Sequence, residues 1–202
     1  MGQGARQGVW GMNEVVKNFG WLSHLRAPIA AGVVPKKLLR IPQGDAQTLL
    51  RGVVRRVADL PVGSSATVVW HDAGAELLVF TDKTTITCSP GLVTIGVTAQ
   101  CDQIERAVTL PVPIAVGTAT APAGLVMHTF SRLAGPPVVT DRWSEAITAF
   151  AWEALLELAS TISAEVGKDT AGRPLVPGSI AAEAEVLLVQ PMARHDLSSK
   201  GG

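Results

Sequence analysis

The sequence is short of charged residues: Asp, Glu, Lys and Arg make up 17% of its 202 residues, whereas about 25% is typical of a soluble domain. Hydrophobic residues, by contrast, account for 47%. A lone domain of this size needs more polar surface, so the shortage predicts that other subunits cover part of the surface. A proteome rich in alanine and valine would give the same composition without such a partner.

The sequence also lacks a segment that would carry it into or across a membrane. Proline, glycine or a charged residue interrupts every apolar stretch well before the roughly 18 residues that a spanning helix needs. Near the start, Arg6 is followed by Asn13 and Glu14 and not by a continuous apolar stretch, so we expect no signal peptide. We expect the protein in the cytoplasm or within an assembled particle.

Cysteine is scarce as well, with two residues, Cys88 and Cys101. In a chain without a secretion signal we expect both thiols to be reduced, buried and structural. A disulfide between them stays open as an alternative if they lie on paired strands.

No complete catalytic motif is present. The glycines of residues 2–8 have one residue too many for a dinucleotide fingerprint, and no strand precedes them. Gly167-Lys168 lacks the earlier glycine of a phosphate-binding loop. The histidines stand singly, without the spacing of metal ligands, so we expect no metal and no cofactor. They are His24, His71, His128 and His195.

The best candidate for chemistry is His71, which precedes Asp72 at the predicted end of a strand. Neighbouring strand residues point to opposite faces, so these two cannot form a dyad by adjacency. A hydrolase would need His71 to meet acids that lie nearby in the fold. Separately, Glu76, Asp102 and Glu105 could converge in space as a carboxylate pair, although nothing in their spacing requires it. The alternative interpretation is structural: a turn with a half-exposed histidine.

The charges that are present are sorted along the chain. Residues 1–56 hold nine bases and two acids, a net charge of +7, whereas the other 146 residues hold eight bases and fifteen acids, a net charge of −7. Such sorting predicts a partner for one part of the chain. The bases of the first part are Arg6, Lys17, Arg26, Lys36, Lys37, Arg40, Arg51, Arg55 and Arg56.

The start of the chain is predicted to be an arm. Residues 1–12 are rich in glycine, a short amphipathic helix follows over 13–25, and prolines and glycines make 28–44 an extended connector. Asp45 is the expected cap of a helix over 46–58, although strand is the competing interpretation there. The apolar stripe of that helix is Leu49, Leu50, Val53, Val54 and Val57.

From residue 66 the sequence is typical of an antiparallel meander, because β-branched residues dominate and apolar positions recur with period two. Tight turns are expected at Ala73-Gly74 and Asp82-Lys83, and a type II turn at Pro90-Gly91. Pro111 and Pro113 lack donors on the same side, which puts residues 108–116 at an edge of the sheet. The predicted strands are Thr67–Trp70, Leu77–Thr81, Thr84–Cys88, Leu92–Thr98 and Glu105–Leu110, with Leu125–Phe130 as a further candidate.

The clearest helix is predicted over 142–166, with Thr140 or Asp141 as its cap and Gly167 at its end. A turn-rich link over 169–179 and a final strand over Ala184–Gln190 follow. The buried stripe of the helix is Trp143, Ile147, Phe150, Ala154, Leu158 and Ile162, and Glu145, Glu153 and Glu157 lie away from it.

These patterns predict an α+β fold: an antiparallel β-sheet packed by one long C-terminal helix. A sheet that rolls toward a barrel stays open as an alternative to a flat meander. The predicted divisions are a basic N-terminal arm over 1–44, an α+β domain over 45–190 and a polar C-terminal tail over 191–202.

The function that fits is a non-enzymatic structural subunit of a large assembly, such as a phage or phage-tail-like particle. Its arm would dock on other copies of itself or on other subunits, whose acidic surface attracts it. The acidic body disfavours nucleic acid as a partner, and the cations are too thinly spread for strong membrane binding. The predicted partner-binding residues are Trp10, Phe19, Trp21, Leu22, Lys36, Lys37, Arg40, Arg51, Arg55 and Arg56.

Two other functions stay open. One is a binding module, whose sheet holds a small apolar ligand or whose arm touches a membrane surface. The other is the hydrolase that uses His71 and nearby acids.

Overall fold

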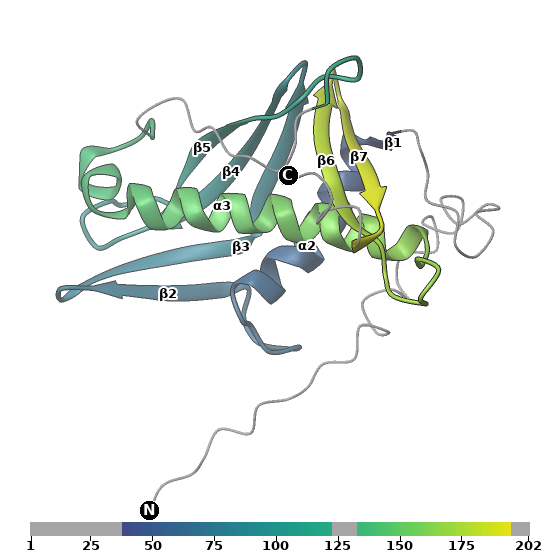
Figure 1. The fold of residues 1–202 in the computed structure, drawn as a ribbon. Helices are drawn as coiled ribbons and strands as arrows, with labels where there is room; N and C mark the ends of the chain where they lie inside the picture. The colour runs from purple at the N-terminus through teal and green to yellow at the C-terminus, as the bar shows by residue number, and fades with distance from the viewer. Residues whose placement is uncertain (1–37, 123–132, 195–202) are drawn as a thin grey trace, which may run out of the picture.

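The computed structural model describes residues 38–122 and 133–194. Within them, the chain forms two antiparallel sheets, with strand orders β1-β7-β6 and β2-β3-β4-β5 (Figure 1). The predicted α+β class and the long C-terminal helix are therefore confirmed. The sheets do not close into a barrel. The predicted helix over 13–25, the strand over Leu125–Phe130 and the end of the tail lie outside the described residues.

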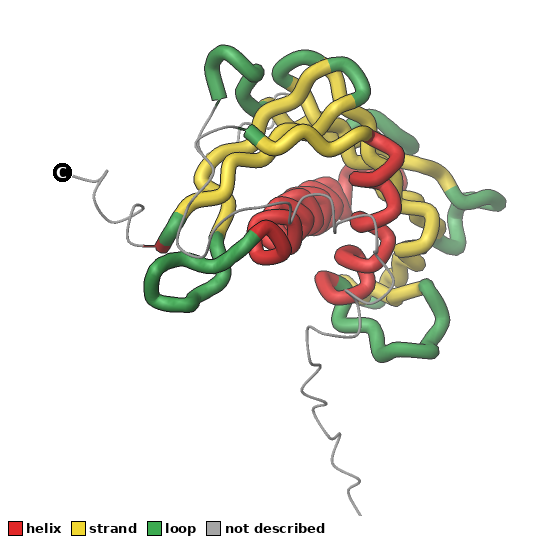
Figure 2. The backbone as a smooth tube through the Cα atoms, turned by 90° about the vertical axis from the view of Figure 1, so that its right-hand side faces the viewer, coloured by secondary structure: helices red, strands yellow, loops and turns green. Residues whose placement is uncertain are grey.

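The helix α3 (Pro137–Val166) lies in the curve that the two sheets form together. Figure 2 shows α3 end-on, with the strands curving over it and α2 (Gln43–Val57) beside it. The sheets meet where Gly117 N–H donates to Ile180 O at 3.1 Å and Ala182 N–H donates to Gly117 O at 2.9 Å. One hydrophobic core therefore spans both sheets and both helices.

The predicted stripe of α3 faces this core, because all six of its residues are buried. The helix begins at Pro137, a turn earlier than the predicted caps Thr140 and Asp141. A proline fits the first helical position, since its missing N–H would have no partner there and its fixed φ suits a helix. The predicted start of the helix was therefore too late in the sequence.

The helix α2 confirms the helical interpretation of residues 46–58. Leu49, Leu50, Val53 and Val54 are buried. The helix begins at Gln43, so Asp45 lies in its first turn and not at its cap. A carboxylate in the first turn still interacts favourably with the positive end of the helix.

Two glutamines of α2 bind the backbone of a strand, and the sequence pattern does not predict these contacts. Gln43 Oε1 accepts the Cys88 N–H at 2.7 Å, and Gln47 Oε1 accepts the Ile86 N–H at 2.9 Å. Gln47 Nε2 donates to Thr84 O at 2.8 Å. These side chains occupy the edge of β3 along which no strand of the described residues pairs with it.

The strand β3 (Ala75–Ser89) is continuous, whereas the sequence predicted two strands with a turn at Asp82-Lys83. That turn is wrong: the register against β4 (Leu92–Gln100) shifts between Phe80 and Thr85, so a bulge absorbs these residues without ending the strand. The other two turns are confirmed.

In the hairpin between β2 (Thr67–Asp72) and β3, Ala73 and Gly74 both have positive φ, 43° and 81°. This is the geometry of a type I′ turn. Gly91 has φ 72° in the turn after Pro90, as a type II turn requires at its third position.

The strand β5 (Val108–Ala115) lies at the edge of its sheet, as its prolines predicted. Pro111 pairs in register with Gly96 and Pro113 with Thr94. Residues 105–107, which the sequence assigned to this strand, belong to the connection before it.

The second sheet contains two strands that the sequence did not predict, β6 and β1. β6 (Val176–Glu183) begins inside the predicted link over 169–179, and it pairs with β7 (Val186–Met192), the predicted final strand. β1 (Leu39–Pro42) pairs with the other side of β7. Residues 39–44, the end of the predicted arm, thus form β1 and the start of α2.

Candidate functional site

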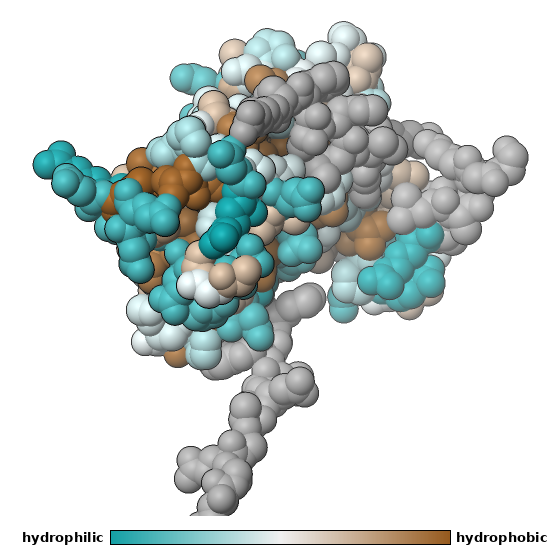
Figure 3. Space-filling view, turned by 90° about the vertical axis from the view of Figure 1, so that its left-hand side faces the viewer, coloured by the Kyte–Doolittle hydropathy of each residue, from teal (hydrophilic) through white to brown (hydrophobic). Residues whose placement is uncertain are grey.

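A hollow of about 580 Å³ opens at the end of the molecule where the β2–β3 turn, the β4–β5 connection and the start of α3 meet. Figure 3 looks onto this end, where hydrophobic surface collects in one area beside hydrophilic residues. The residues that line the hollow are Gly74, Ala75, Glu76, Cys101, Asp102, Gln103, Pro137, Val138, Asp141, Arg142 and Trp143. Three segments that lie far apart in the sequence therefore build it.

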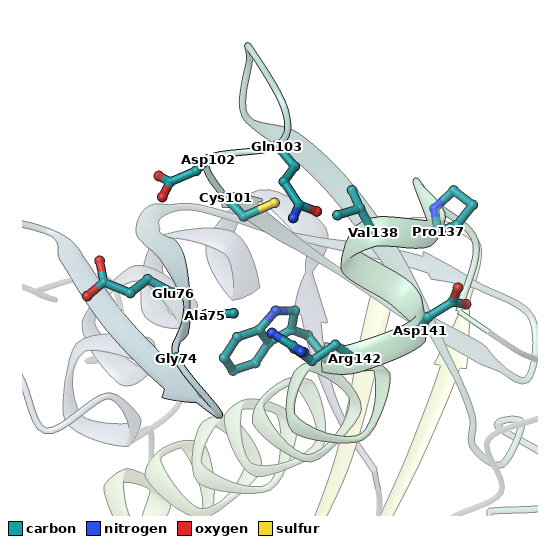
Figure 4. A pocket seen from close by; sticks show the side chains of 11 residues that line it. Gly74, Ala75, Glu76, Cys101, Asp102, Gln103, Pro137, Val138, Asp141 and Arg142 are labelled. Carbon is teal, nitrogen blue, oxygen red and sulfur yellow. The ribbon is translucent and has the colours of Figure 1, made fainter.

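The carboxylates of the hollow do not converge on its centre. Figure 4 shows Gln103 and Arg142 reaching inward, while the carboxylates of Glu76, Asp102 and Asp141 point outward. Arg142 also lies near the tip of the hairpin, with its Nε 3.6 Å from Asp72 Oδ2. Glu105, a candidate from the sequence, does not line the hollow. The hollow thus lacks an inward-facing pair of carboxylates for acid–base chemistry.

His71 lies outside the hollow, on the exposed end of β2. Its Nδ1 is 3.4 Å from Glu76 Oε1, and the two side chains are 67% and 59% exposed. A solvent-facing pair in a hairpin does not exclude water or orient a substrate. The described residues therefore give the hydrolase hypothesis no enclosed site at His71.

The two cysteines differ in burial, and the buried one is not set up for reactivity. Both are free thiols; Cys88 is buried, as expected, whereas Cys101 is half-buried, so the prediction that both are buried is wrong for Cys101. Burial raises the pKa of Cys88 to about 11, so its thiolate is hardly populated at neutral pH. Within residues 38–122 and 133–194, no group of three or more His, Cys, Asp or Glu side chains could hold a metal ion.

Three of the predicted partner-binding arginines have contacts within their own chain. Arg40 Nη2 lies 2.7 Å from Glu183 Oε2, and Arg56 Nη2 lies 3.0 Å from Glu157 Oε1. Arg55 donates to the backbone of the loop before β2, at 3.0 Å from Pro61 O. Arg51 is exposed. That these residues also bind a partner stays a prediction. Trp10, Phe19, Trp21, Leu22, Lys36 and Lys37 lie outside the described residues.

The helix α3 presents an acidic face to solvent. Its sequence holds five acids and one base, a net charge of −4. Glu145 and Glu153 are exposed, as predicted. Between and beside them, Trp152 and Leu156 are half-buried apolar residues. The exposed side of α3 therefore combines negative charge with accessible apolar surface, which is the chemistry that a basic segment rich in aromatic residues would complement.

The buried carboxylate of Asp169 is structural. It lies in the tight loop after α3 and is 4% exposed. Its Oδ1 accepts the N–H groups of Ala171 and Arg173, each at 2.9 Å, and its Oδ2 lies 2.8 Å from Arg173 Nε. The Arg173 backbone N–H makes the largest contribution to lowering the pKa of Asp169, and the Arg173 side chain and the Ala171 N–H add to it.

We expect this carboxylate to make stability depend on acid pH. Because the pKa of Asp169 is lower in the folded chain, folding favours its ionised form. That stability is complete above the unfolded pKa of about 4 and is lost as pH falls through the folded pKa. The variant Asp169→Asn should therefore unfold at a lower urea concentration than the natural chain at neutral pH. The difference between the two urea midpoints should become smaller below about pH 4. A difference in urea midpoint that stays constant with pH would contradict this role of the Asp169 carboxylate.

No family model matches the sequence, and no curated protein and no solved structure matches it either. In the described part of the chain, no helix has both the length and the apolar character needed to cross a membrane.

Proposed function

We propose that the protein is a non-enzymatic assembly subunit, in which the N-terminal segment of one copy docks on α3 of another copy. The observation that supports it best is the acidic, partly apolar face of α3. Residues 1–37 hold five bases and one acid, a net charge of +4, against the −4 of α3. Trp10, Phe19 and Trp21 supply the apolar side chains that could cover Trp152 and Leu156.

The two kinds of interaction would have different roles. The opposite charges would speed the encounter and set the register, while burial of the aromatic side chains would supply most of the affinity. Contacts between exposed charges weaken as salt screens them. Association should therefore fall as the salt concentration rises.

The first test is the mass of the full chain by size-exclusion chromatography with light scattering. We expect oligomers in about 0.1 M salt, where the Debye length is about 10 Å, and smaller species in about 1 M salt, where it is about 3 Å. Deleting residues 1–37, which spares the strand at Leu39–Pro42, should leave a folded chain that no longer associates in this way. A monomer under every condition would refute the proposal.

A matched pair of charge reversals tests the docking surface. The double variant Glu145→Lys/Glu153→Lys should weaken association at low salt by at least about tenfold, because two attractive charges become repulsive. The control Asp82→Lys/Glu105→Lys reverses two other exposed acids and changes the net charge equally. If both double variants act alike, the effect is one of net charge, and α3 is not the docking surface. The particle to which such a subunit would belong, including the phage-like particle, stays a prediction.

A further inference from the structure

The edges of the sheet β2-β3-β4-β5 are protected unequally. At β5, Pro111 and Pro113 remove donors. Along the second half of β3, Gln43 and Gln47 cover the open backbone groups. β2 has neither device, since its sequence TVVWHD contains no proline and no lysine. None of the described residues pairs with the outer edge of β2. Such an edge is a template for another strand.

The phase of β2 shows which of its backbone groups are open. Ala66 O accepts the Thr81 N–H of the next strand at 2.7 Å. Backbone groups of successive residues alternate in direction along a strand. Thr67, Val69 and His71 therefore direct their N–H and C=O groups away from the sheet, where a further strand could bind them.

One exposed apolar side chain lies on this edge strand itself. Among residues 38–122 and 133–194, the exposed large hydrophobic side chains are Val62, which is 72% exposed, and Val69, which is 40% exposed. Val69 lies in the middle of β2, and Val62 lies on the loop that leads into it. On the inner face, Val68 and Trp70 are half-buried against the core. A strand added here would gain backbone hydrogen bonds and would cover apolar surface.

We propose that this edge pairs with β2 of a second copy, antiparallel across a two-fold axis at Val69. The inference rests on the proposed function in one respect: both require copies of the chain to associate. With the axis at Val69, this residue faces Val69 of the second copy, Val68 faces Trp70, and Thr67 faces His71. Every residue from 67 to 71 thus meets a residue of the same stretch, and no like charges are opposed.

The sequence of β2 is what favours a second copy as the occupant. A two-fold interface requires a patch that complements itself, and β-branched and aromatic residues opposite one another stabilise strand pairs. Moving the axis to Trp70 would instead set Val68 opposite Asp72 of the second copy. The axis at Val69 avoids that contact, and it joins the four-stranded sheets of two copies into one continuous sheet.

Charge pairs placed at position 69 test this register in the full chain. Val69→Lys alone and Val69→Glu alone should each raise the dissociation constant of the dimer at least about tenfold, because apolar cover is lost and like charges meet at the axis. An equal mixture of the two variants should restore association, since a lysine then faces a glutamate. The control Val62→Lys makes the same change at the neighbouring exposed valine and should leave the constant unchanged. Sedimentation velocity measures all four samples.

Amide hydrogen exchange of the natural chain gives a second readout that needs no variant. The outward amides of Thr67, Val69 and His71 should become protected as protein concentration rises, because they donate to the second copy. The pairing is overturned if these amides exchange freely while the chain is dimeric. It is equally overturned if Val69→Lys leaves the dimer intact, or if mixing the two charged variants restores nothing.

The outcomes also separate this inference from the docking of the N-terminal segment. Pairing through β2 should persist in about 1 M salt, where charge contacts are screened. Salt-sensitive oligomers with unprotected β2 amides would leave the proposed function standing and refute the pairing. A salt-resistant dimer that depends on Val69 and is unchanged by Glu145→Lys/Glu153→Lys would support the pairing through β2 and refute the docking on α3.

Discussion

Replacing Gln47 with leucine should lower the free energy of unfolding by about 2–4 kcal/mol, because two buried backbone groups would lose their partners at about 1–3 kcal/mol each. These groups are the Ile86 N–H and the Thr84 carbonyl, both on the edge of β3 that no strand covers in the described part of the chain. Leucine has a similar size to glutamine, so the loss would come from the hydrogen bonds and not from a cavity. Urea denaturation monitored by circular dichroism measures the change.

Gln43 offers a matched control one turn earlier on the same helix. Its side chain accepts a single backbone bond, from Cys88, so Gln43→Leu should cost about half as much, about 1–2 kcal/mol. If both variants unfold within about 0.5 kcal/mol of the natural chain, water replaces the glutamines at the β3 edge. In that case α2 does not protect this edge, and the edge of β2 would no longer differ from that of β3 in its protection.

These glutamines show what could not be predicted from the sequence. A glutamine within a helix is typical of a solvated surface. Only the packing of α2 on β3 turns Gln43 and Gln47 into partners of strand residues that lie 37 to 45 positions away in the sequence. The bulge in β3 is hidden for the same reason. Asp82-Lys83 is a good turn sequence, and pairing with a long neighbouring strand overrides that local preference.

Local periodicity, in contrast, was enough for several elements. The stripe of α3 and the proline edge of β5 follow from the spacing of nearby residues, so they could be predicted. β6 could not, because Pro177 and Gly178 near its start are typical of a turn. In the fold, a side chain at Gly178 would collide with Met192 of the paired strand, so this glycine serves strand packing and not chain reversal.

Some of the candidate surfaces could likewise be predicted from local spacing, and others could not. The acids of α3 could be placed on the outer side of the helix, because helical spacing alone determines which residues lie opposite the stripe. The hollow could not be located, since its residues come from three separate segments. The sequence did single out Glu76 and Asp102 as neighbours, but it held no information on the direction of their carboxylates. The open edge of β2 emerges only once the order of the strands is known.

The largest loss of stability is expected from Leu158→Ala in α3, at about 3–4 kcal/mol, because a large side chain would be removed from a close-packed core that cannot collapse around the gap. Leu158 is fully buried. The helix that carries it packs against α2, against β6 and β7 of the three-stranded sheet, and against β4 and β5 of the four-stranded sheet. A cavity at this position would therefore weaken the packing of both sheets on α3. Thermal and urea unfolding should show a single transition at a lower midpoint, since one core spans both sheets.

Leu156→Ala makes the identical change two residues earlier, where the side chain is half-buried. It should cost about 1 kcal/mol, since less apolar surface leaves water on folding. Equal losses at the two positions would mean that the exposed side of α3 is covered in solution, and the assembly proposal requires that such covering depend on salt and on residues 1–37. Two separate transitions in Leu158→Ala would instead show that the two sheets unfold independently. The curved arrangement around α3 would then not be one cooperative unit, and the edge of β2 would belong to a sheet that can open without the rest.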